Sequence, residues 1–255
     1  MTHQLAACFL CFLLTMCYGK WYHYKKEVKN MNLYIVRHGN PDYVNDRLTE
    51  LGHRQAEACA EDMLGLEIDD IYASPYGRAQ ETAAHLANKL SKPIVTLPWA
   101  HEVEHYSDNG RGGVTMGIMM DPTLLRSPEM EALGDKWASH PAFRDEASAR
   151  FMVDEVYDGM REFLASYGYI EDGKRFRVVD GGSEKNVALY CHAGVFLIMA
   201  EYLLRLPTMT GWTSFFTWQT GITWVHLNES GGYSVPRFYT MGKTDHLSKR
   251  GIDIT

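Results

Sequence analysis

An apolar run of strand length that ends abruptly in polar residues constrains the fold of this chain more than any other feature. Leu33 to Val36 are too few to form a helix of their own and are rich in strand formers, so we predict a buried strand. Arg37, His38 and Gly39 follow it directly. Ligands of open α/β sheets bind just outside the carboxyl ends of the strands. These side chains, with a glycine that lets the backbone turn tightly, therefore indicate a site of chemistry, although a solvated strand end is the simpler alternative.

Strand and helix patterns alternate through most of the chain after this point. Thr49 is a suitable N-cap for the first helix, and Pro75 suits the first turn of the second helix. The expected strands comprise residues 33–36, 68–74, 93–97, 187–191, 222–227 and 237–241. A helix over about 195–206 follows the fourth of them. The alternation predicts a three-layer α/β/α fold with a mostly parallel central sheet.

The stretch between the third and fourth strands departs from this pattern. Residues 99 to about 140 are rich in Gly, Met, Asp and Pro, whereas residues 144–167 have the apolar face of a long helix. Such a long excursion usually carries function or covers a site, so we expect a lid-like insertion over about 105–167. Its candidate ligand contacts are Tyr106, Arg111 and Met116. A surface loop without ligand contacts is the alternative.

The composition fits a globular protein and argues against a general nucleic-acid binder. The formal net charge of -7 argues against such a protein, because a general nucleic-acid binder needs a basic face to displace counterions. A local phosphate pocket built from a few arginines remains compatible with this charge. Of the five cysteines, only Cys59 and Cys191 lie outside the N-terminal stretch, which suits a reducing compartment and is no disulfide framework.

The N-terminal residues 1–30 form an apolar extension that we separate from a single domain expected over residues 31–255. Residues 5–18 are strongly apolar but too short to span a bilayer comfortably, and no Lys or Arg precedes them as in a signal peptide. We favour a translation start at Met31 and a cytoplasmic protein. The alternative is a start at Met1 with export or membrane anchoring, and membrane contact is expected only if residues 5–18 are retained.

Three of the expected strands end in residues suited to holding a phosphoryl group. The first strand delivers Arg37 and His38. The second leads into Arg78, and the fourth ends in His192 at the start of a helix. If these strands are parallel neighbours, the four side chains converge on one crevice. Arginine grips phosphate oxygens bidentately, helix N-termini favour anions, a neutral imidazole can attack phosphorus, and a second, cationic imidazole can stabilise the transferring oxygens.

An acid that protonates the departing alcohol and then activates water is expected after the third strand. Residues 99–105 read Trp-Ala-His-Glu-Val-Glu-His. We select Glu102 as this acid and keep Glu104 as the alternative, because spacing alone does not separate them. A carboxylate on a solvated loop is the non-catalytic interpretation.

The same segment matches the H-E-x-x-H pattern of zinc proteases, with histidines at His101 and His105. That pattern requires both histidines on one face of a stable helix and a third ligand elsewhere. Pro98 precedes the segment and a glycine-rich stretch follows it, so the helix would be about one turn long and marginal. We therefore expect neither a metal site nor another cofactor.

Together these motifs resemble the histidine phosphatase superfamily, also called the phosphoglycerate-mutase-like family. The residues that carry the resemblance are Arg37-His38-Gly39, Leu48-Thr49 through Gly52 with Gln55-Ala56, Ser74-Pro75 with Arg78-Ala79 and Thr82-Ala83, His192-Ala193-Gly194, and Asp245-His246-Leu247. They span roughly residues 31–247. The motif R-H-G followed in order by S-P-x-x-R-A is a specific combination.

The resemblance implies a phosphoglycerate-mutase-like fold and a role for each candidate residue. His38 would be the phosphorylated nucleophile, and Arg37, Arg78 and the second catalytic histidine His192 would hold the phosphoryl group. The acid would come from the loop that holds Glu102, although the position of this acid varies within the family. Asn40, which follows the R-H-G motif, is a further candidate for binding the substrate phosphate.

Departures from the family pattern favour hydrolysis over intramolecular transfer. Metabolic mutases of this family usually follow R-H-G with a serine-x-tryptophan-asparagine pattern, where this chain has Asn40-Pro41-Asp42-Tyr43. A mutase must hold its phosphoenzyme away from water, whereas a phosphatase admits water. We therefore expect a metal-independent phosphomonoester hydrolase whose partner is a small phosphorylated metabolite. A phosphoglycerate-type mutase and a catalytically impaired phosphate-binding module are the alternatives, and no oligomeric state is indicated.

Overall fold

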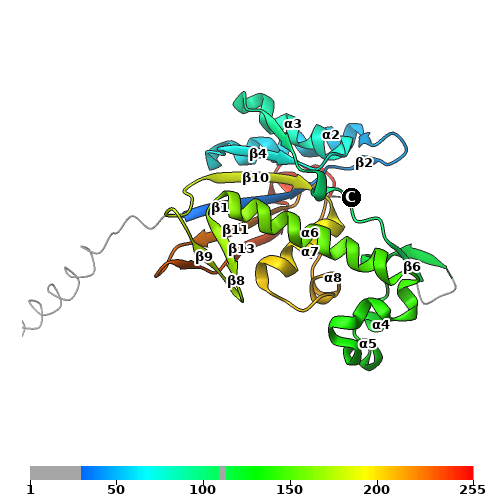
Figure 1. Ribbon diagram of the computed structural model, residues 1–255. Helices are drawn as coiled ribbons and strands as arrows, with labels where there is room; N and C mark the ends of the chain where they lie inside the picture. Colours follow the sequence, from blue (N-terminus) through cyan, green and yellow to red (C-terminus); the bar gives the residue numbers. More distant parts are fainter. Residues whose placement is uncertain (1–29, 109–112, 255) are drawn as a thin grey trace, which may run out of the picture.

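The computed structural model describes residues 30–108 and 113–254, which are built around a six-stranded sheet (Figure 1). Its strands comprise β1 (Asn30–Arg37), β4 (Asp70–Ala73), β5 (Ile94–Thr96), β10 (Asn186–Cys191), β11 (Ile222–Asn228) and β13 (Arg237–Lys243). They lie in the order β13-β11-β1-β10-β4-β5. Neighbours from β1 to β5 in this order run parallel, whereas β11 is antiparallel to both of its neighbours. The predicted mostly parallel sheet is confirmed.

Two helical layers cover the two faces of this sheet. They comprise α2 (Glu50–Met63) and α3 (Gly77–Leu90) on one side, and α6 (Glu146–Ser166) and α7 (Ala193–Leu204) on the other (Figure 1). Along β1, Leu33 and Ile35 pack in the core with α6 and α7, while Tyr34 and Val36 pack in the core with α2 and α3. Because side chains alternate across a strand and both faces are covered, β1 is apolar at every position from Leu33 to Val36. The predicted α/β/α layering is confirmed.

The predicted helix starts are correct in one case and wrong in another. Thr49 caps α2, and its Oγ1 accepts a hydrogen bond from the Gly52 N–H at 3.0 Å. Pro75 does not lie in the first turn of α3, because that helix begins at Gly77 after an extended Tyr76. The Tyr76 N–H instead donates to Ser74 Oγ at 3.2 Å, so Pro75 belongs to a turn that precedes the helix.

The excursion between β5 and α6 is folded from short pieces gathered at one end of the molecule (Figure 1). They comprise η2 (Pro98–Ala100), β6 (Tyr106–Asp108), β7 (Val114–Met116), η3 (Gly117–Met119), α4 (Pro122–Leu125), α5 (Pro128–Leu133), η4 (Gly134–Ser139) and η5 (Pro141–Phe143). Trp137 and Phe143 pack edge-to-face, with ring centroids 5.0 Å apart, and Trp137 packs in the same way on Trp212 of α8 (Thr210–Ser214) at 5.6 Å. Aromatic packing thus ties the excursion to the helix that follows α7. Arg111 lies outside the described residues.

A small second sheet was not predicted. It pairs β12 (Tyr233–Ser234), β9 (Arg175–Val178) and β8 (Tyr169–Asp172) in that order. Gly173 has a positive φ of 62° at the first position of the two-residue loop between β8 and β9, so this glycine is the signal that could have revealed the hairpin. The remaining short elements are β2 (Pro41–Asp42), β3 (Arg47–Leu48), η1 (Leu64–Leu66) and α9 (Asp245–Ser248).

Residues 1–29 of the apolar extension, which include residues 5–18 and the start at Met1, lie outside the described residues, whereas Asn30 already belongs to β1. Within residues 30–108 and 113–254, no helix combines the length and apolar character needed to cross a membrane. The domain assignment over residues 31–255, with a lid-like insertion over 105–167, stays a prediction.

Candidate active site

The carboxyl ends of three adjacent parallel strands meet at one edge of the sheet. The register pairs Arg37 of β1 with Cys191 of β10, and the His38 N–H donates to the Cys191 carbonyl at 2.9 Å. On the other side of β10, the Ser74 N–H that follows β4 donates to the Tyr190 carbonyl at 2.9 Å. These pairings place the residues that follow each strand next to one another. The imidazole centroids of His38 and His192 consequently lie 5.0 Å apart.

Two glycines allow the turn after β1 to lie against the start of α2. A Cβ added to Gly39 would come 2.7 Å from the Gly52 carbonyl oxygen, and one added to Gly52 would come 2.2 Å from the Asn40 carbonyl oxygen. No side chain fits at either position without moving the backbone. The glycines of R-H-G and of the first helix therefore serve one close backbone contact.

Hydrogen bonds from the next two helices fix this turn. The Gly39 N–H donates to Thr82 Oγ1 at 3.0 Å, and the Asn40 N–H donates to Gln55 Oε1 at 2.8 Å. Asn40 Oδ1 accepts from the Thr49 hydroxyl at 2.8 Å. The structure thus shows the Asn40 amide oxygen attached to the start of α2, and the predicted phosphate-binding role of Asn40 stays a prediction.

His38 is held as a neutral imidazole with a defined tautomer. Its side chain is buried, and its Nδ1 lies 2.7 Å from the Gly39 carbonyl oxygen. A carbonyl can only accept, so Nδ1 carries the proton and Nε2 keeps the lone pair. Burial, aided by the charges of Arg37 and Arg78, lowers the pKa of His38 to about 3. The imidazole is therefore neutral through the physiological range.

His192 lies at the N-terminus of α7 and is also buried. Its Nε2 lies 2.7 Å from Ser74 Oγ, while its buried Nδ1 has no hydrogen-bond partner among the described residues. Burial and then the charge of a protonated His38 and of Arg78 hold the pKa of His192 well below its ordinary value. One ring nitrogen is thus anchored and the other is left free.

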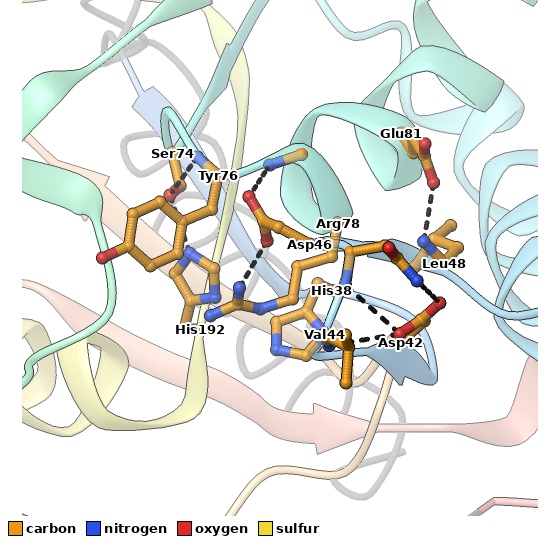
Figure 2. Close-up of polar contacts among 12 residues, drawn as sticks. His38, Asp42, Val44, Asp46, Leu48, Ser74, Tyr76, Arg78, Glu81 and His192 are labelled. Carbon is orange, nitrogen blue, oxygen red and sulfur yellow. Dashed lines mark hydrogen bonds and ion pairs between the residues drawn. The ribbon is translucent and has the colours of Figure 1, made fainter.

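The two arginines are held by different segments. Arg78 Nη1 contacts Asp46 Oδ1 at 2.5 Å, and the other oxygen of Asp46 accepts from the Gly77 N–H at 2.6 Å. Figure 2 shows the Arg78 side chain extending toward the two imidazoles, with a dashed line joining its guanidinium to Asp46. The ring of Tyr76 lies 4.8 Å from the same guanidinium carbon. Asp46 and Tyr76 therefore orient a cation at the centre of the cluster.

Arg37 is held by the loop that precedes β11. Its Nη1 donates to the Thr217 carbonyl at 2.6 Å, and its own carbonyl accepts from the Thr220 N–H at 3.0 Å. Thr220 Oγ1 lies 2.9 Å from Nε2 of the buried His246. The Asp-His-Leu motif near the C-terminus thus supports the loop that positions Arg37.

Glu102 binds the N-terminus of the helix that His192 begins. Its carboxylate accepts from the Gly194 N–H at 3.3 Å and from the Val195 N–H at 3.1 Å. A Cβ on Gly194 would lie 2.5 Å from Glu102 Oε1, so the glycine makes this approach possible. Burial raises the pKa of the Glu102 carboxyl, against the opposing effect of the helix N–H groups. Glu104 is exposed instead and accepts from the Tyr76 hydroxyl at 2.7 Å.

The two histidines of the H-E-x-x-H pattern anchor the segment that carries Glu102. Residues 101–105 are not helical, so the geometry of a zinc-protease helix is absent from this segment. His101 Nε2 contacts Glu155 of α6 at 3.1 Å. The ring of the buried His105 contacts Ser148 Oγ and the Phe143 carbonyl, each at 2.9 Å. Both rings fix the segment against α6 and the end of the excursion.

Arg37, Arg78 and Glu102 line one end of a cavity of about 590 Å³. Tyr106 and Met116, two of the predicted ligand contacts, also line it. The cavity therefore brings Arg37, Arg78 and Glu102 together with part of the predicted lid, while the buried His38 and His192 are not among its lining residues. The chemical role of each side chain stays a prediction.

Sequence reasoning missed Asp46 and Thr217, which orient the two arginines. Asp46 lies in the loop between two short strands with a positive φ of 48°, and Thr217 lies in the loop before β11. Neither has a local pattern that marks it, because each reaches its arginine only through the tertiary fold.

Known proteins share this chain's motifs and its fold. A family model described as the histidine phosphatase superfamily (branch 1) matches residues 33–112. A probable phosphatase of Schizosaccharomyces pombe is 25% identical over 232 residues, which cover 85% of this chain and 95% of the relative. A 2,3-bisphosphoglycerate-dependent phosphoglycerate mutase of Thermoplasma acidophilum is 38% identical over 72 residues, which cover 24% of this chain. That match spans 36% of the mutase, about a third of its length.

Solved structures extend the likeness of fold to most of the chain. A phosphoserine phosphatase from Entamoeba histolytica, in complex with 3-phosphoglyceric acid, has a TM-score of 0.56 at 18% identity, covering 85% of this chain and 99% of that one. A mycobacterial glucosyl-3-phosphoglycerate phosphatase in complex with VO3 has a TM-score of 0.52 at 20% identity, covering 82% and 97%. At these identities the likeness concerns the fold, and it confirms the phosphoglycerate-mutase-like fold expected from the motifs.

Proposed function

Because this chain belongs to the histidine phosphatase superfamily, we propose that it hydrolyses phosphomonoesters through a phosphohistidine at His38. One observation carries the proposal: two neutral imidazoles and two oriented arginines converge at the ends of three parallel strands. An imidazole with a free lone pair attacks phosphorus, and guanidinium groups stabilise the charge on the transferring oxygens. We also propose that residues 31–255 form the catalytic domain and that the excursion over 105–167 covers its site.

In the first step, His38 Nε2 forms a bond to phosphorus while the bond from phosphorus to the ester oxygen breaks. The Gly39 carbonyl keeps the proton on Nδ1, so the lone pair of Nε2 faces the reaction. If the Ser74 hydroxyl donates to His192 Nε2, the free Nδ1–H of His192 can donate to a phosphoryl oxygen. Both imidazoles are buried, so the phosphoryl group reaches Nε2 only after neighbouring side chains move.

Glu102 supplies and then recovers one proton. In its acid form it protonates the departing alcohol oxygen, and as carboxylate it accepts a proton from the water that attacks phosphohistidine. The second step forms a phosphorus–water oxygen bond, breaks the bond to Nε2 and releases phosphate. The raised pKa of Glu102 suits this task because it keeps the acid form populated at higher pH. Glu104 stays the alternative acid.

The mutase alternative has less support. The match to the phosphoglycerate mutase is confined to 72 residues, whereas the match to a probable phosphatase extends over 232 residues. A requirement for a bisphosphate primer, with isomerisation and no net release of phosphate, would favour the mutase.

Replacement of the nucleophile tests the proposed mechanism. We expect His38→Ala to lose at least about 10⁴-fold of the phosphate release from 4-nitrophenyl phosphate, since covalent transfer is removed. His85→Ala is a matched control, because His85 pairs with Glu57 away from the cluster. Labelled phosphoenzyme, trapped in alkaline detergent because phosphohistidine is labile in acid, should appear in the control and not in His38→Ala. Undiminished turnover by His38→Ala would contradict the mechanism.

A further inference from the structure

The cavity that begins at the two arginines continues into a wall of aromatic and methionine side chains. Arg37, Arg78 and Glu102 form the polar part of the lining. The rest, which we call the apolar wall, includes Tyr106, Met119, Trp212, Phe215, Phe216 and Trp218. Its residues come from the excursion and from the segment between α7 and β11. The volume of about 590 Å³ lies within the range of roughly 300–1,000 Å³ that is typical of small-molecule sites. The cavity therefore has room for a leaving group much larger than the phosphoryl group.

Several side chains of the apolar wall are unusually exposed for their type. Met119 is 67% exposed, Phe216 59% and Trp218 43%, and the Phe216 and Trp218 rings pack edge-to-face with centroids 4.9 Å apart. Single exposed apolar residues are ordinary on protein surfaces, but a group of them around one cavity marks a binding surface. This group is continuous with the residues proposed to bind phosphate, so the leaving group of the same substrate is the occupant that fits.

The charges of the cavity disfavour an acidic leaving group. Within residues 30–108 and 113–254, the cationic side chains of the lining are Arg37 and Arg78, and both lie at the phosphate end. The anionic side chains are those of Glu102 and Glu104. A carboxylate on the leaving group would lose water and face Glu104, with no cation besides the two arginines among the described lining residues.

We propose that the substrates are phosphomonoesters whose leaving group is bulky, uncharged and aromatic. Aromatic rings are the preferred occupant because the wall is itself aromatic, and edge-to-face ring pairs add to the gain from burial. This inference rests on the proposed phosphatase activity. Under this inference the substrate of this chain differs from phosphoserine, which carries a carboxylate that a cation would have to bind.

Three aryl phosphates that differ only beyond the reacting bond test the inference. Phenyl phosphate and 2-naphthyl phosphate release phenols of nearly equal acidity, so their kcat/KM ratio measures the burial of a second ring. We expect 2-naphthyl phosphate to be favoured about tenfold or more. Free phosphotyrosine adds an ammonium and a carboxylate to phenyl phosphate, and it should be hydrolysed more slowly than phenyl phosphate.

Variants of the apolar wall make the test specific. Phe216→Ala and Trp218→Ala should each reduce the naphthyl-to-phenyl ratio of kcat/KM by about threefold or more. Phe151→Ala should leave that ratio unchanged, because Phe151 is 65% exposed on α6 and lies outside the cavity lining.

The outcomes distinguish the two proposals. The substrate class would be overturned by equal kcat/KM values for the phenyl and naphthyl esters, by a preference for phosphotyrosine, or by an unchanged naphthyl-to-phenyl ratio in both wall variants. Each of these results would leave the phosphatase activity intact. No phosphate release from any of the three esters would overturn the proposed function, and the inference with it.

Discussion

The phosphate end and the apolar end of the cavity are built in opposite ways. At the phosphate end, hydrogen bonds hold His38 to the Gly39 carbonyl after β1, Arg78 to Asp46 in the loop between β2 and β3, and Glu102 to the start of α7. At the apolar end, Met119 and Phe216 come from loops and short helical pieces and are more than half exposed. Specific hydrogen bonds thus fix the reacting groups, whereas exposed apolar side chains supply the surface for the rest of the substrate.

This contrast shows which changes should affect chemistry and which should affect selectivity. A side chain fixed by buried hydrogen bonds has one geometry, so removing it should slow turnover of every substrate. An exposed apolar side chain stabilises only a leaving group that covers it. The following predictions use this difference, and they are ordered from the largest expected effect to the smallest.

Arg78→Ala should have the largest effect. We expect a loss of roughly 10³-fold or more in kcat/KM, since an arginine on a transferring phosphoryl group is typically worth this much. The loss should be equal for phenyl and 2-naphthyl phosphate, because Arg78 acts at the phosphate end. Arg126→Ala, at a surface position that contacts Thr213, is the control. A loss confined to one ester would contradict the separation of the two ends.

Glu102→Gln should lower turnover by about 10²-fold or more for poor leaving groups, and less for 4-nitrophenyl phosphate, which departs without a proton. The wild-type rate of poor leaving groups should fall as pH rises through the pKa of Glu102, because the acid form is lost. This alkaline fall should disappear in Glu102→Gln. His38, with a pKa of about 3, should not limit the rate on the acid side above that pH.

Glu104→Gln decides between the two candidate acids. If it causes the larger loss and removes the alkaline fall, the assignment to Glu102 is wrong.

Gly194→Ala should disturb the cavity where its phosphate end, at Glu102, meets its apolar end, at Ile118. The added Cβ would come 2.1 Å from Ile118 Cδ1 and 2.5 Å from Glu102 Oε1, so both the cavity wall and the acid must shift. We expect a loss of about tenfold in turnover and about 1–3 kcal/mol in the free energy of unfolding. Gly65→Ala is the matched control, because its Cβ would have nothing within 4 Å. Equal behaviour of the two variants would argue against a tight contact at Gly194.

Thr49→Ala should have the smallest effect. It removes the cap of α2 and the hydrogen bond to Asn40 Oδ1, and should cost about 1 kcal/mol in the free energy of unfolding, measured by denaturant titration. Thr49→Ser keeps the hydroxyl and should recover most of the loss. No difference between the two variants would show that the cap contributes little.

Local sequence signals predicted the framework of the fold well, because they depend on neighbouring residues. The strands β1 and β10 are buried on both faces, so each contains a continuous apolar run. Such a run indicates a buried strand without any alternation of polar and apolar residues. The cap at Thr49 follows from a hydroxyl at the right spacing. The turn at Pro75 was misplaced because the Ser74 hydroxyl, which also reaches His192, bonds the backbone before the helix begins.

The sequence by itself determined the succession along the chain of the six central strands and the residue types that end them, since both depend on short apolar runs and their flanking residues. It marked Arg37, His38, Arg78 and His192 as candidates on that basis. Only the tertiary structure decided how they are oriented, because Asp46 and Thr217 reach the arginines from distant loops. It also distinguished the surroundings of Glu102 from those of Glu104, by placing one carboxylate on the N-terminus of α7 and leaving the other exposed. Contacts between residues far apart in the chain depend on packing, which no local pattern encodes.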